Sequence, residues 1–315
     1  MKIGITLPQM GPQATRENII QLAKMAEQEH FDSLWVGERL LWPLKPQTPY
    51  PLTPDGSWPT FYQNVFDPLE ALTFAAANTQ KIALGTSVMD MLFHNPVVLA
   101  RRFATLDVLS EGRAICGLGI GSFKDEYQVS NIPYEHRGAR ADEFVQALKK
   151  IWTEDIVEFK GEFYNIPASK IGPKPIQKPH IPIYLAGFVP NTFSRITKYA
   201  DGWLPAAGGP LEYLANGIKT LREQGVKANR DPNEFKIVVL TFPQIVTDSA
   251  ATKDSNNTSS NRHKVPLNGT TIDEVGDDLH KIREMGADHV IFGLTGIMDL
   301  KQVIDTAKQL SRYAR

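Results

Sequence analysis

The sequence predicts an α/β fold, specifically a (β/α)8 TIM barrel with insertion segments. Short apolar runs bounded by turn residues alternate with longer segments whose apolar residues recur at helical spacing, which is typical of repeated βα units. The short runs number eight, the count that closes a barrel. The competing fold, an open doubly wound sheet, usually begins with a glycine-rich turn, and Leu7-Pro8-Gln9-Met10 after the first run is not one.

The elements follow in order along the chain. The first run carries Ile3, Ile5 and Leu7 at alternate positions, as a strand with one buried face does. The predicted strands are 2–7, 33–36, 82–87, 114–119, 181–186, 202–204, 236–240 and 289–292. Helical spacing follows them, and the clearest predicted helices are 17–29, 68–78, 96–109, 211–224 and 299–311.

Composition narrows the classes of function. The chain has 315 residues, 42% hydrophobic and 22% charged, which suits one barrel domain over 1–315. With 34 Lys and Arg against 35 Asp and Glu, the net charge of -1 gives no electrostatic reason to expect nucleic acid or a membrane as partner. Cys116 is the only cysteine, and the N-terminus resembles a first strand and not a secretion signal, so we expect a cytoplasmic protein.

Three insertion segments interrupt the βα pattern. Residues 39–66 are rich in proline and aromatic residues and are either a stiff surface loop or a wall of a substrate pocket. Within 156–178, alternating apolar residues around Lys160-Gly161 predict a hairpin at 157–165 that lies over the barrel. Residues 248–271 are rich in Ser, Thr and Asn, and are either disordered or a lid that orders when a cofactor binds.

Candidate functional residues follow the strands, because the loops at the C-terminal ends of barrel strands converge at one mouth. Alternate glycines in Gly117-Leu118-Gly119-Ile120-Gly121-Ser122 either let a flat ring or a phosphate approach the backbone or allow tight packing. At the end of the third strand, Ser87 is small and polar enough to face the mouth.

Two further strand ends carry chemistry. Glu38-Arg39 follows the second strand and is either a pair that handles protons or orients a ligand, or a surface ion pair. Ala186-Gly187 precedes Pro190-Asn191-Thr192, a predicted helix start that either binds a phosphate or is capped by its own side chains. No histidine lies at metal-ligand spacing with a carboxylate and no serine nucleophile motif is present, so we expect neither a metal nor hydrolysis.

Several segments, taken in their order along the chain, resemble the bacterial-luciferase-like superfamily of flavin and F420 oxidoreductases, and the resemblance covers nearly the whole chain. The resemblance lies in Phe31-Asp32-Ser33-Leu34-Trp35-Val36, Leu84-Gly85-Thr86-Ser87-Val88, Asn95-Pro96-Val97-Val98-Leu99-Ala100, Leu109-Ser110-Glu111-Gly112-Arg113, Arg137-Gly138-Ala139-Arg140, Pro173-Lys174-Pro175 and Ala200-Asp201-Gly202-Trp203. It implies a (β/α)8 barrel that binds FMN or F420 near its third and fourth strands. The Ser87-Val88 pair most resembles the pair found in the members that use F420.

The resemblance also implies roles for individual residues. It puts Glu38 at a cofactor-contacting position and a non-proline cis peptide bond at Ser87-Val88. Ile120, Gly121 and Ser122 would lie beside the ring or its tail. Ala186 and Gly187 would lie near the phosphate.

Three positions depart from the family pattern. Arg39 stands where several F420 relatives have a catalytic histidine, and it cannot donate a proton at ordinary pH. Ser122 replaces an acid that some relatives carry, and Gly187-Phe188 replaces a frequent Gly-Gly pair. Acid-base work would then pass to Glu38, Glu126 or the substrate, and we name Glu38, Arg39 and Glu126 as candidate catalytic residues.

The leading hypothesis is an F420-dependent oxidoreductase that transfers a hydride between the deazaflavin and a small organic substrate held under the loop of Trp42 and Trp58. The second is an FMN-dependent monooxygenase that uses reduced flavin and oxygen and is fed by a separate reductase. The third is a non-catalytic flavin-binding relative, motivated by Arg39 and Ser122. A homo-oligomer is implied by the resemblance alone.

Overall fold

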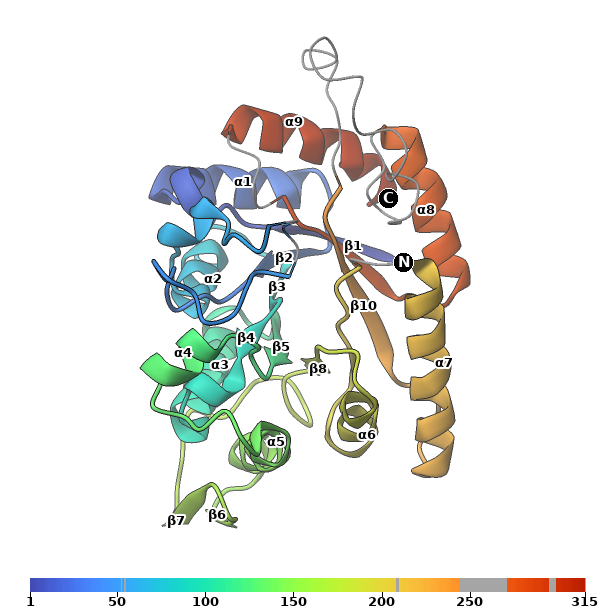
Figure 1. Ribbon diagram of the computed structural model, residues 1–315. Helices are drawn as coiled ribbons and strands as arrows, with labels where there is room; N and C mark the ends of the chain where they lie inside the picture. The colour runs from blue at the N-terminus through green and yellow to red at the C-terminus, as the bar shows by residue number, and fades with distance from the viewer. Residues whose placement is uncertain (52, 54, 208–209, 244–270, 295–298, 315) are drawn as a thin grey trace.

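Eight parallel strands close into a barrel in the computed structural model, which describes residues 1–51, 53, 55–207, 210–243, 271–294 and 299–314 (Figure 1). The barrel strands are β1 (Lys2–Thr6), β2 (Ser33–Val36), β3 (Ala83–Thr86), β5 (Ala114–Gly119), β8 (Ile183–Leu185), β9 (Gly202–Trp203), β10 (Lys236–Thr241) and β11 (His289–Phe292). Pairing of β1 with β11 and of β3 with β5 completes the ring. The predicted fold and all eight predicted strands are confirmed.

One short strand has no counterpart in the prediction. Strand β4 (Met89–Asp90) continues the path of β3 after a break and pairs with the end of β5, Met89 opposite Leu118 and Asp90 opposite Gly119. A 3-10 helix, η3 (Met91–Phe93), follows it directly. This extension of the third βα unit forms part of the barrel mouth.

Helices lie outside the strands (Figure 1). They are α1 (Arg16–Gln28), α2 (Pro68–Ala76), α3 (Pro96–Leu109), α4 (Lys124–Val129), α5 (Arg137–Thr153), α6 (Pro190–Tyr199), α7 (Leu211–Lys227), α8 (Ile272–Glu284) and α9 (Leu300–Leu310). Several begin at side-chain caps: the side chains of Thr15, Asp67 and Asn95 each accept a hydrogen bond from a backbone N–H in the first turn. The five predicted helices are confirmed to within a few residues of their ends.

Trp35 fills the inside of the barrel. It is fully buried with Leu204, Val238 and Ile291, and its Nε1 donates to Ser33 Oγ at 2.6 Å. A Cβ added at Gly85 would lie 2.4 Å from the Trp35 ring. Glycine at that position therefore makes room for the indole inside the barrel.

The hairpin predicted at 157–165 forms, but it does not lie over the barrel. Strands β6 (Val157–Lys160) and β7 (Asn165–Ser169) pair antiparallel and project beyond α5 (Figure 1). The Glu143 carboxylate of α5 accepts hydrogen bonds from the backbone N–H groups of Glu162, Phe163 and Tyr164. The hairpin therefore belongs to the outer surface of α5.

The predicted lid or disordered segment, 248–271, lies outside the described residues except for Thr271, which caps α8. Across the ranges that are described, no helix combines the length and apolarity that crossing a membrane requires.

Candidate active site at the barrel mouth

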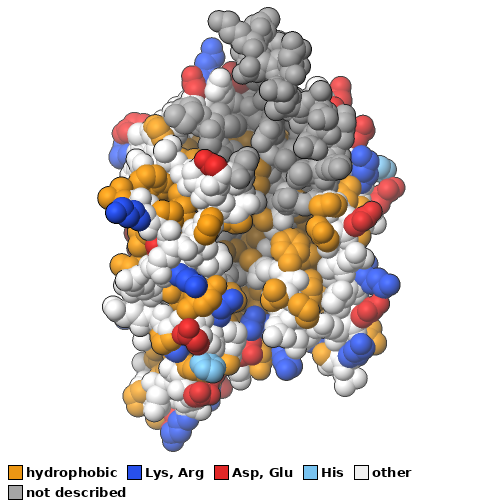
Figure 2. Space-filling view, in the orientation of Figure 1, with side chains coloured by type: hydrophobic (Ala, Val, Ile, Leu, Met, Phe, Trp, Pro, Cys, Tyr) orange, Lys and Arg blue, Asp and Glu red, His pale blue; other side chains and the backbone are white. Residues whose placement is uncertain are grey.

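A cavity of about 730 Å³ opens at the C-terminal ends of the barrel strands. Figure 2 looks onto a face that is hollowed near its middle, with hydrophobic side chains gathered in the hollow. Nine of the predicted site residues line the cavity: Glu38, Arg39, Ser87, Val88, Ile120, Gly121, Ser122, Ala186 and Gly187. The tenth, Glu126, has a fully buried side chain and is not among the lining residues.

The strand ends at the mouth are joined through the Ser87-Val88 peptide bond, which is cis, as the resemblance implies. Ser87 donates its backbone N–H to the Val36 carbonyl at 2.6 Å, and the Val88 carbonyl accepts from the Glu38 N–H at 3.0 Å. These two bonds link the ends of β2 and β3. They bring Glu38 and Val88 to the same wall of the cavity.

The glycines of the fourth barrel strand allow tight packing, and Gly119 and Gly121 also line the cavity. An added Cβ at Gly117 would lie 1.8 Å from the Thr86 carbonyl oxygen, and one at Gly119 would lie 2.7 Å from both Val88 and Asp90. At Gly121 it would meet the Phe93 ring at 2.7 Å. Of the two readings of this motif, the packing one is correct, because the chain after β3 occupies the space.

Glu38 does not pair with its neighbour Arg39. Its Oε1 lies 2.8 Å from His94 Nε2, and its Oε2 accepts the Asp90 backbone N–H at 2.8 Å. The side chain is 6% exposed, so both carboxylate oxygens are held in a nearly dry wall of the cavity. His94 went unnoticed in the sequence because the search for histidines considered only metal-ligand spacing.

Arg39 pairs with Glu126 instead. Its Nη1 donates to Glu126 Oε2 at 3.1 Å, and the other oxygen of Glu126 accepts the Leu40 N–H at 3.0 Å. The guanidinium lies 4.6 Å from the centre of the Phe123 ring and 5.4 Å from that of Tyr62. Burial raises the pKa of the Glu126 carboxyl, while Arg39 lowers it.

Asp90 is a further site residue that was not predicted from the sequence. Its Oδ1 accepts the Gly121 N–H at 3.0 Å, and its Oδ2 lies 3.6 Å from Arg39 Nη1. The residue is 6% exposed and lines the cavity. Burial raises the pKa of its carboxyl to about 7, with Arg39 lowering it and Glu126 and Glu38 raising it. The available signal was an acid within the apolar run 88–93 just after a barrel strand.

Another part of the cavity wall is formed by the start of α6 and the residues before it. Ala186, Gly187, Val189 and Thr192 line it together with Arg137. Val189 is the N-cap and no side chain caps the helix, so the predicted capping by Asn191 or Thr192 is wrong. Gly187 has φ +122°, and an added Cβ would meet Thr192 Oγ1 at 2.8 Å. A cation and an uncapped helix start therefore lie in one part of the cavity.

The insertion 39–66 supplies a wall, but not through its tryptophans. Tyr50, Thr53, Pro59, Phe61 and Tyr62 line the cavity. Trp58 is buried with Tyr50 and Phe123, and Trp42 packs against that cluster and donates from Nε1 to the Trp58 carbonyl at 3.3 Å. The tryptophans thus support the wall from behind. The loop that carries them lines the cavity, and the predicted position of the substrate under this loop stays a prediction.

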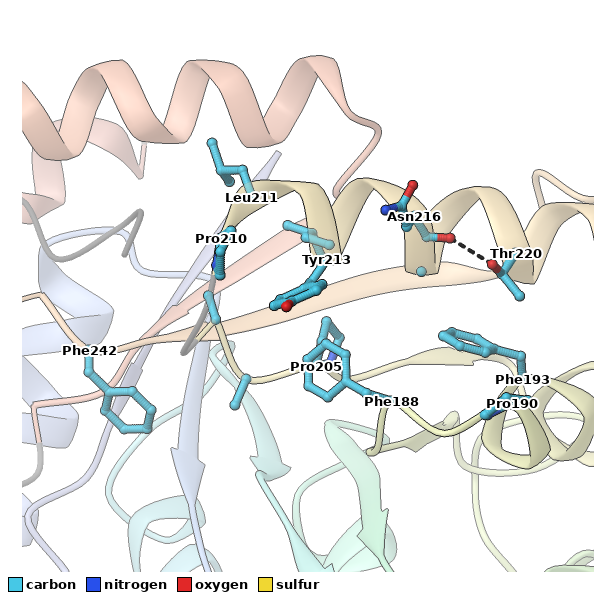
Figure 3. Close-up of a pocket in the computed structure, with 14 residues that line it drawn as sticks. Phe188, Pro190, Phe193, Pro205, Pro210, Leu211, Tyr213, Asn216, Thr220 and Phe242 are labelled. Carbon is cyan, nitrogen blue, oxygen red and sulfur yellow. Dashed lines mark hydrogen bonds between the residues drawn. The ribbon is translucent and has the colours of Figure 1, made fainter. Parts of the chain in front are cut away.

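A second cavity of about 740 Å³ lies beside the first, between α6 and α7 (Figure 3). Pro190 and Phe193 line it from the α6 side and Tyr213 from α7, and nearly all of its lining is apolar. Phe188 and Phe242 line both cavities, so the two are neighbours.

The described residues contain no group of three or more His, Cys, Asp or Glu side chains arranged to hold a metal ion. The side chains at the mouth include buried carboxyl groups, the guanidinium groups of Arg39 and Arg137, and the imidazole of His94 beside Glu38.

Comparison with known proteins places this arrangement in a family. An uncharacterized protein of Mycobacterium tuberculosis is 31% identical over 275 residues, covering 86% of this chain and 85% of that protein. An F420-dependent glucose-6-phosphate dehydrogenase of Kineococcus radiotolerans is 32% identical over 218 residues, covering 67% of this chain and 58% of that protein. The solved structure of an F420-dependent secondary alcohol dehydrogenase in complex with an F420-acetone adduct superposes with a TM-score of 0.79 at 20% identity, covering 100% and 99% of the two chains.

The family description of luciferase-like monooxygenases matches residues 1–291. Since that range holds all eight barrel strands but the last residue of β11, together with the whole described mouth, the chain belongs to the luciferase-like monooxygenase family and is an oxidoreductase.

Proposed function

We propose that this protein is an F420-dependent oxidoreductase that transfers a hydride between deazaflavin F420 and a small organic substrate. The observation that carries the proposal is the cavity itself, which is lined by Ser87, Val88, Ile120 and Gly121 at the strand ends and by Arg137 and the start of α6. Its volume lies within the range of pockets that enclose a ligand of this size. The F420-dependent relative of K. radiotolerans supports the choice of cofactor.

The ring would lie against the wall formed by Ser87, Val88, Ile120 and Gly121. The side chains of Val88 and Ile120 would contact the faces of a flat heterocycle, and the Ser87 hydroxyl would hydrogen-bond its edge. When bound, the deazaflavin supplies the carbon that gives or accepts the hydride. Glu38 lies in the same wall, where His94 and the Asp90 N–H fix the direction of its carboxylate.

The phosphate of the cofactor would lie at the start of α6. Pro190 has no N–H and the Thr192 N–H is bonded to the Val189 carbonyl, so the first turn would attract an anion through the Asn191 N–H and the helix dipole, and Arg137 adds a full positive charge. Gly187 brings the main chain close because its positive φ is one that other residues rarely adopt. Ala186 lies in the same wall.

Arg39 and Glu126 would position the wall and not exchange protons. Arg39 stays charged at any ordinary pH. Glu126 has both oxygens engaged and does not line the cavity. Their ion pair would hold Arg39 over Phe123 and Tyr62, at the junction between the ring wall and the wall from 39–66.

Titration of the purified protein with F420 and with FMN tests the cofactor. We expect F420 to bind more tightly, and Arg137→Gln to weaken that binding by roughly tenfold or more, since a charge-assisted bond contributes about 1.5–3 kcal/mol. Arg16→Gln, a change at a side chain 69% exposed on α1, is the matched control and should leave binding unchanged.

The second candidate is an FMN-dependent monooxygenase, which the family description favours. Tight FMN binding without F420 affinity would select it and reject the first. Tight F420 binding without hydride exchange across a panel of ketones, alcohols and enones would instead support a non-catalytic binding protein. The mass of the assembled protein in solution tests the expected homo-oligomer, and addition of a flavin or F420 reductase tests the need for a separate partner.

A further inference from the structure

Three carboxyl groups and two possible cations meet in the wall of the mouth cavity. Glu38 lies 2.8 Å from His94, and Glu126 lies 3.1 Å from Arg39. Each of these two carboxyl groups therefore has a basic partner within hydrogen-bond distance. Asp90 has none of its own, because its Oδ2 lies 3.6 Å from an Arg39 that already donates to Glu126.

The three carboxyl groups also differ in what their oxygens contact. Glu38 has one oxygen on His94 and the other on the Asp90 N–H, and Glu126 has its oxygens on Arg39 and on the Leu40 N–H. Asp90 uses Oδ1 for the Gly121 N–H, and no described residue donates a hydrogen bond to its Oδ2. Asp90 also lines the cavity. Its Oδ2 is the one carboxyl oxygen of the three that is left for a ligand.

The surroundings of Asp90 raise the pKa of its carboxyl group, so that protonated and ionised forms are both present near neutral pH. Arg39 and Glu38 face it from the end of β2, and Glu126 and Tyr127 from α4. Burial raises the pKa of Asp90 to about 7 and outweighs the lowering by Arg39, while both glutamates raise it further. An acid whose pKa lies near the working pH can both give and take a proton.

We propose that Asp90 is the acid-base residue of this site, and that the substrate is a carbonyl compound or the corresponding alcohol. This inference rests on the proposed function. Hydride transfer to or from a carbon that bears oxygen needs a proton transfer at that oxygen, and Asp90 Oδ2 is placed for it.

The step balances with a reduced deazaflavin as the reductant. The hydride forms a C–H bond at the carbonyl carbon while the double bond to oxygen becomes single, and Oδ2 of Asp90 gives its proton to that oxygen. The deazaflavin is oxidised and the carbonyl compound is reduced to an alcohol. The new carboxylate of Asp90 lies 3.6 Å from Arg39, which stabilises it until water returns a proton. Alcohol oxidation is the same step reversed.

One test reads the protonation state directly and needs no cofactor. In protein labelled with ¹³C at the Asp carboxyl carbons, one resonance should titrate with a midpoint near 7 and disappear in Asp90→Asn. In Asp125→Asn, the matched control on the outer side of α4, that resonance should stay. A resonance that is lost in Asp90→Asn but titrates in the usual range near 4 overturns the proposal.

The second test uses turnover of secondary alcohols and ketones with F420. Asp90→Asn should lower kcat by about 10²–10⁴-fold and remove the limb of the pH profile near 7, with the Kd for F420 within about threefold of the wild-type value. Asp90→Glu should recover part of kcat, and Asp125→Asn should behave as wild type. Asp90→Asn with kcat within threefold of wild type overturns the role of Asp90.

The outcomes separate this inference from the proposed function. Wild-type protein that binds F420 and exchanges hydride only with substrates that lack a carbon-bound oxygen overturns the substrate class alone. Wild-type protein that binds only FMN overturns the proposed function, and with it the carbonyl substrate. In that case the ¹³C titration still decides whether Asp90 is the proton-bearing group of the mouth.

Discussion

Breaking the buried ion pair of Arg39 and Glu126 should destabilise the protein, and the burial of the pair sets the expected size of the loss. Arg39→Met would leave the Glu126 carboxylate without a cation in a fully buried position. Removing one partner of a buried ion pair costs about 3–5 kcal/mol, because the remaining charge is desolvated without compensation. For a chain of this length that corresponds to a fall in Tm of roughly 5–8 °C.

The cost should depend on pH in a defined direction. Burial already raises the pKa of Glu126 and Arg39 lowers it, so loss of Arg39 would raise that pKa further. A folded-state pKa above the unfolded value means that the folded protein binds a proton more tightly. The variant would therefore be least impaired at acidic pH, where protonation neutralises Glu126, and would lose stability as pH rises.

Thermal and urea unfolding of four proteins would measure this: Arg39→Met, Glu126→Gln, the double variant and Lys219→Met. The double variant should lose less than the sum of the two single changes, since neither charge is then stranded. Lys219→Met breaks an exposed 3.9 Å pair with Glu223 and should cost at most about 1 kcal/mol. If the free energy of unfolding of Arg39→Met lies within 1 kcal/mol of the wild-type value at pH 8, the pair is not buried and unscreened as argued, and the reasoning is refuted.

Three further predictions concern the scaffold. Gly117→Ala would force a Cβ to within 1.8 Å of the Thr86 carbonyl oxygen, so we expect a variant that is less stable by several kcal/mol or does not accumulate as folded protein, as measured by circular dichroism. Burial lowers the pKa of His289 to about 3, so the folded protein resists protonation of this imidazole. As pH falls below 6.5, the wild-type protein should therefore lose about 1.4 kcal/mol of stability per pH unit relative to His289→Gln. Parallel Tm curves for the two proteins from pH 7 to 4.5 would contradict this. Glu143→Ala removes the acceptor of three backbone N–H groups and should speed hydrogen exchange in 162–164 by about 30-fold, a loss of about 2 kcal/mol, while exchange in the barrel strands stays unchanged.

The barrel could be predicted from the sequence because its signals are local. Apolar runs such as 33–36 and 236–240 are short, are bounded by turn residues and alternate with helical spacing, and each feature depends on residues that are neighbours in the chain. The positions of Glu38, Ser87 and Ile120 at one mouth followed from the same reasoning, since parallel barrel strands share the direction of their C-terminal ends. The hairpin at 157–165 could be predicted in the same way, but its position on the outer surface of α5 could not.

What only the tertiary structure decided is which groups meet. Glu38, Asp90 and Glu126 come from three separate βα loops, and closure of the barrel brings the two glutamates and Arg39 close to Asp90. The glycines of 117–121 are visible in the sequence, but their meaning depends on Thr86, Val88 and Phe93, about 30 residues earlier in the chain, which fill the space above them. The spacing of residues in the sequence indicates which helices and strands form. Burial and charge pairing depend on contacts between those helices and strands, and these contacts set the protonation of the site.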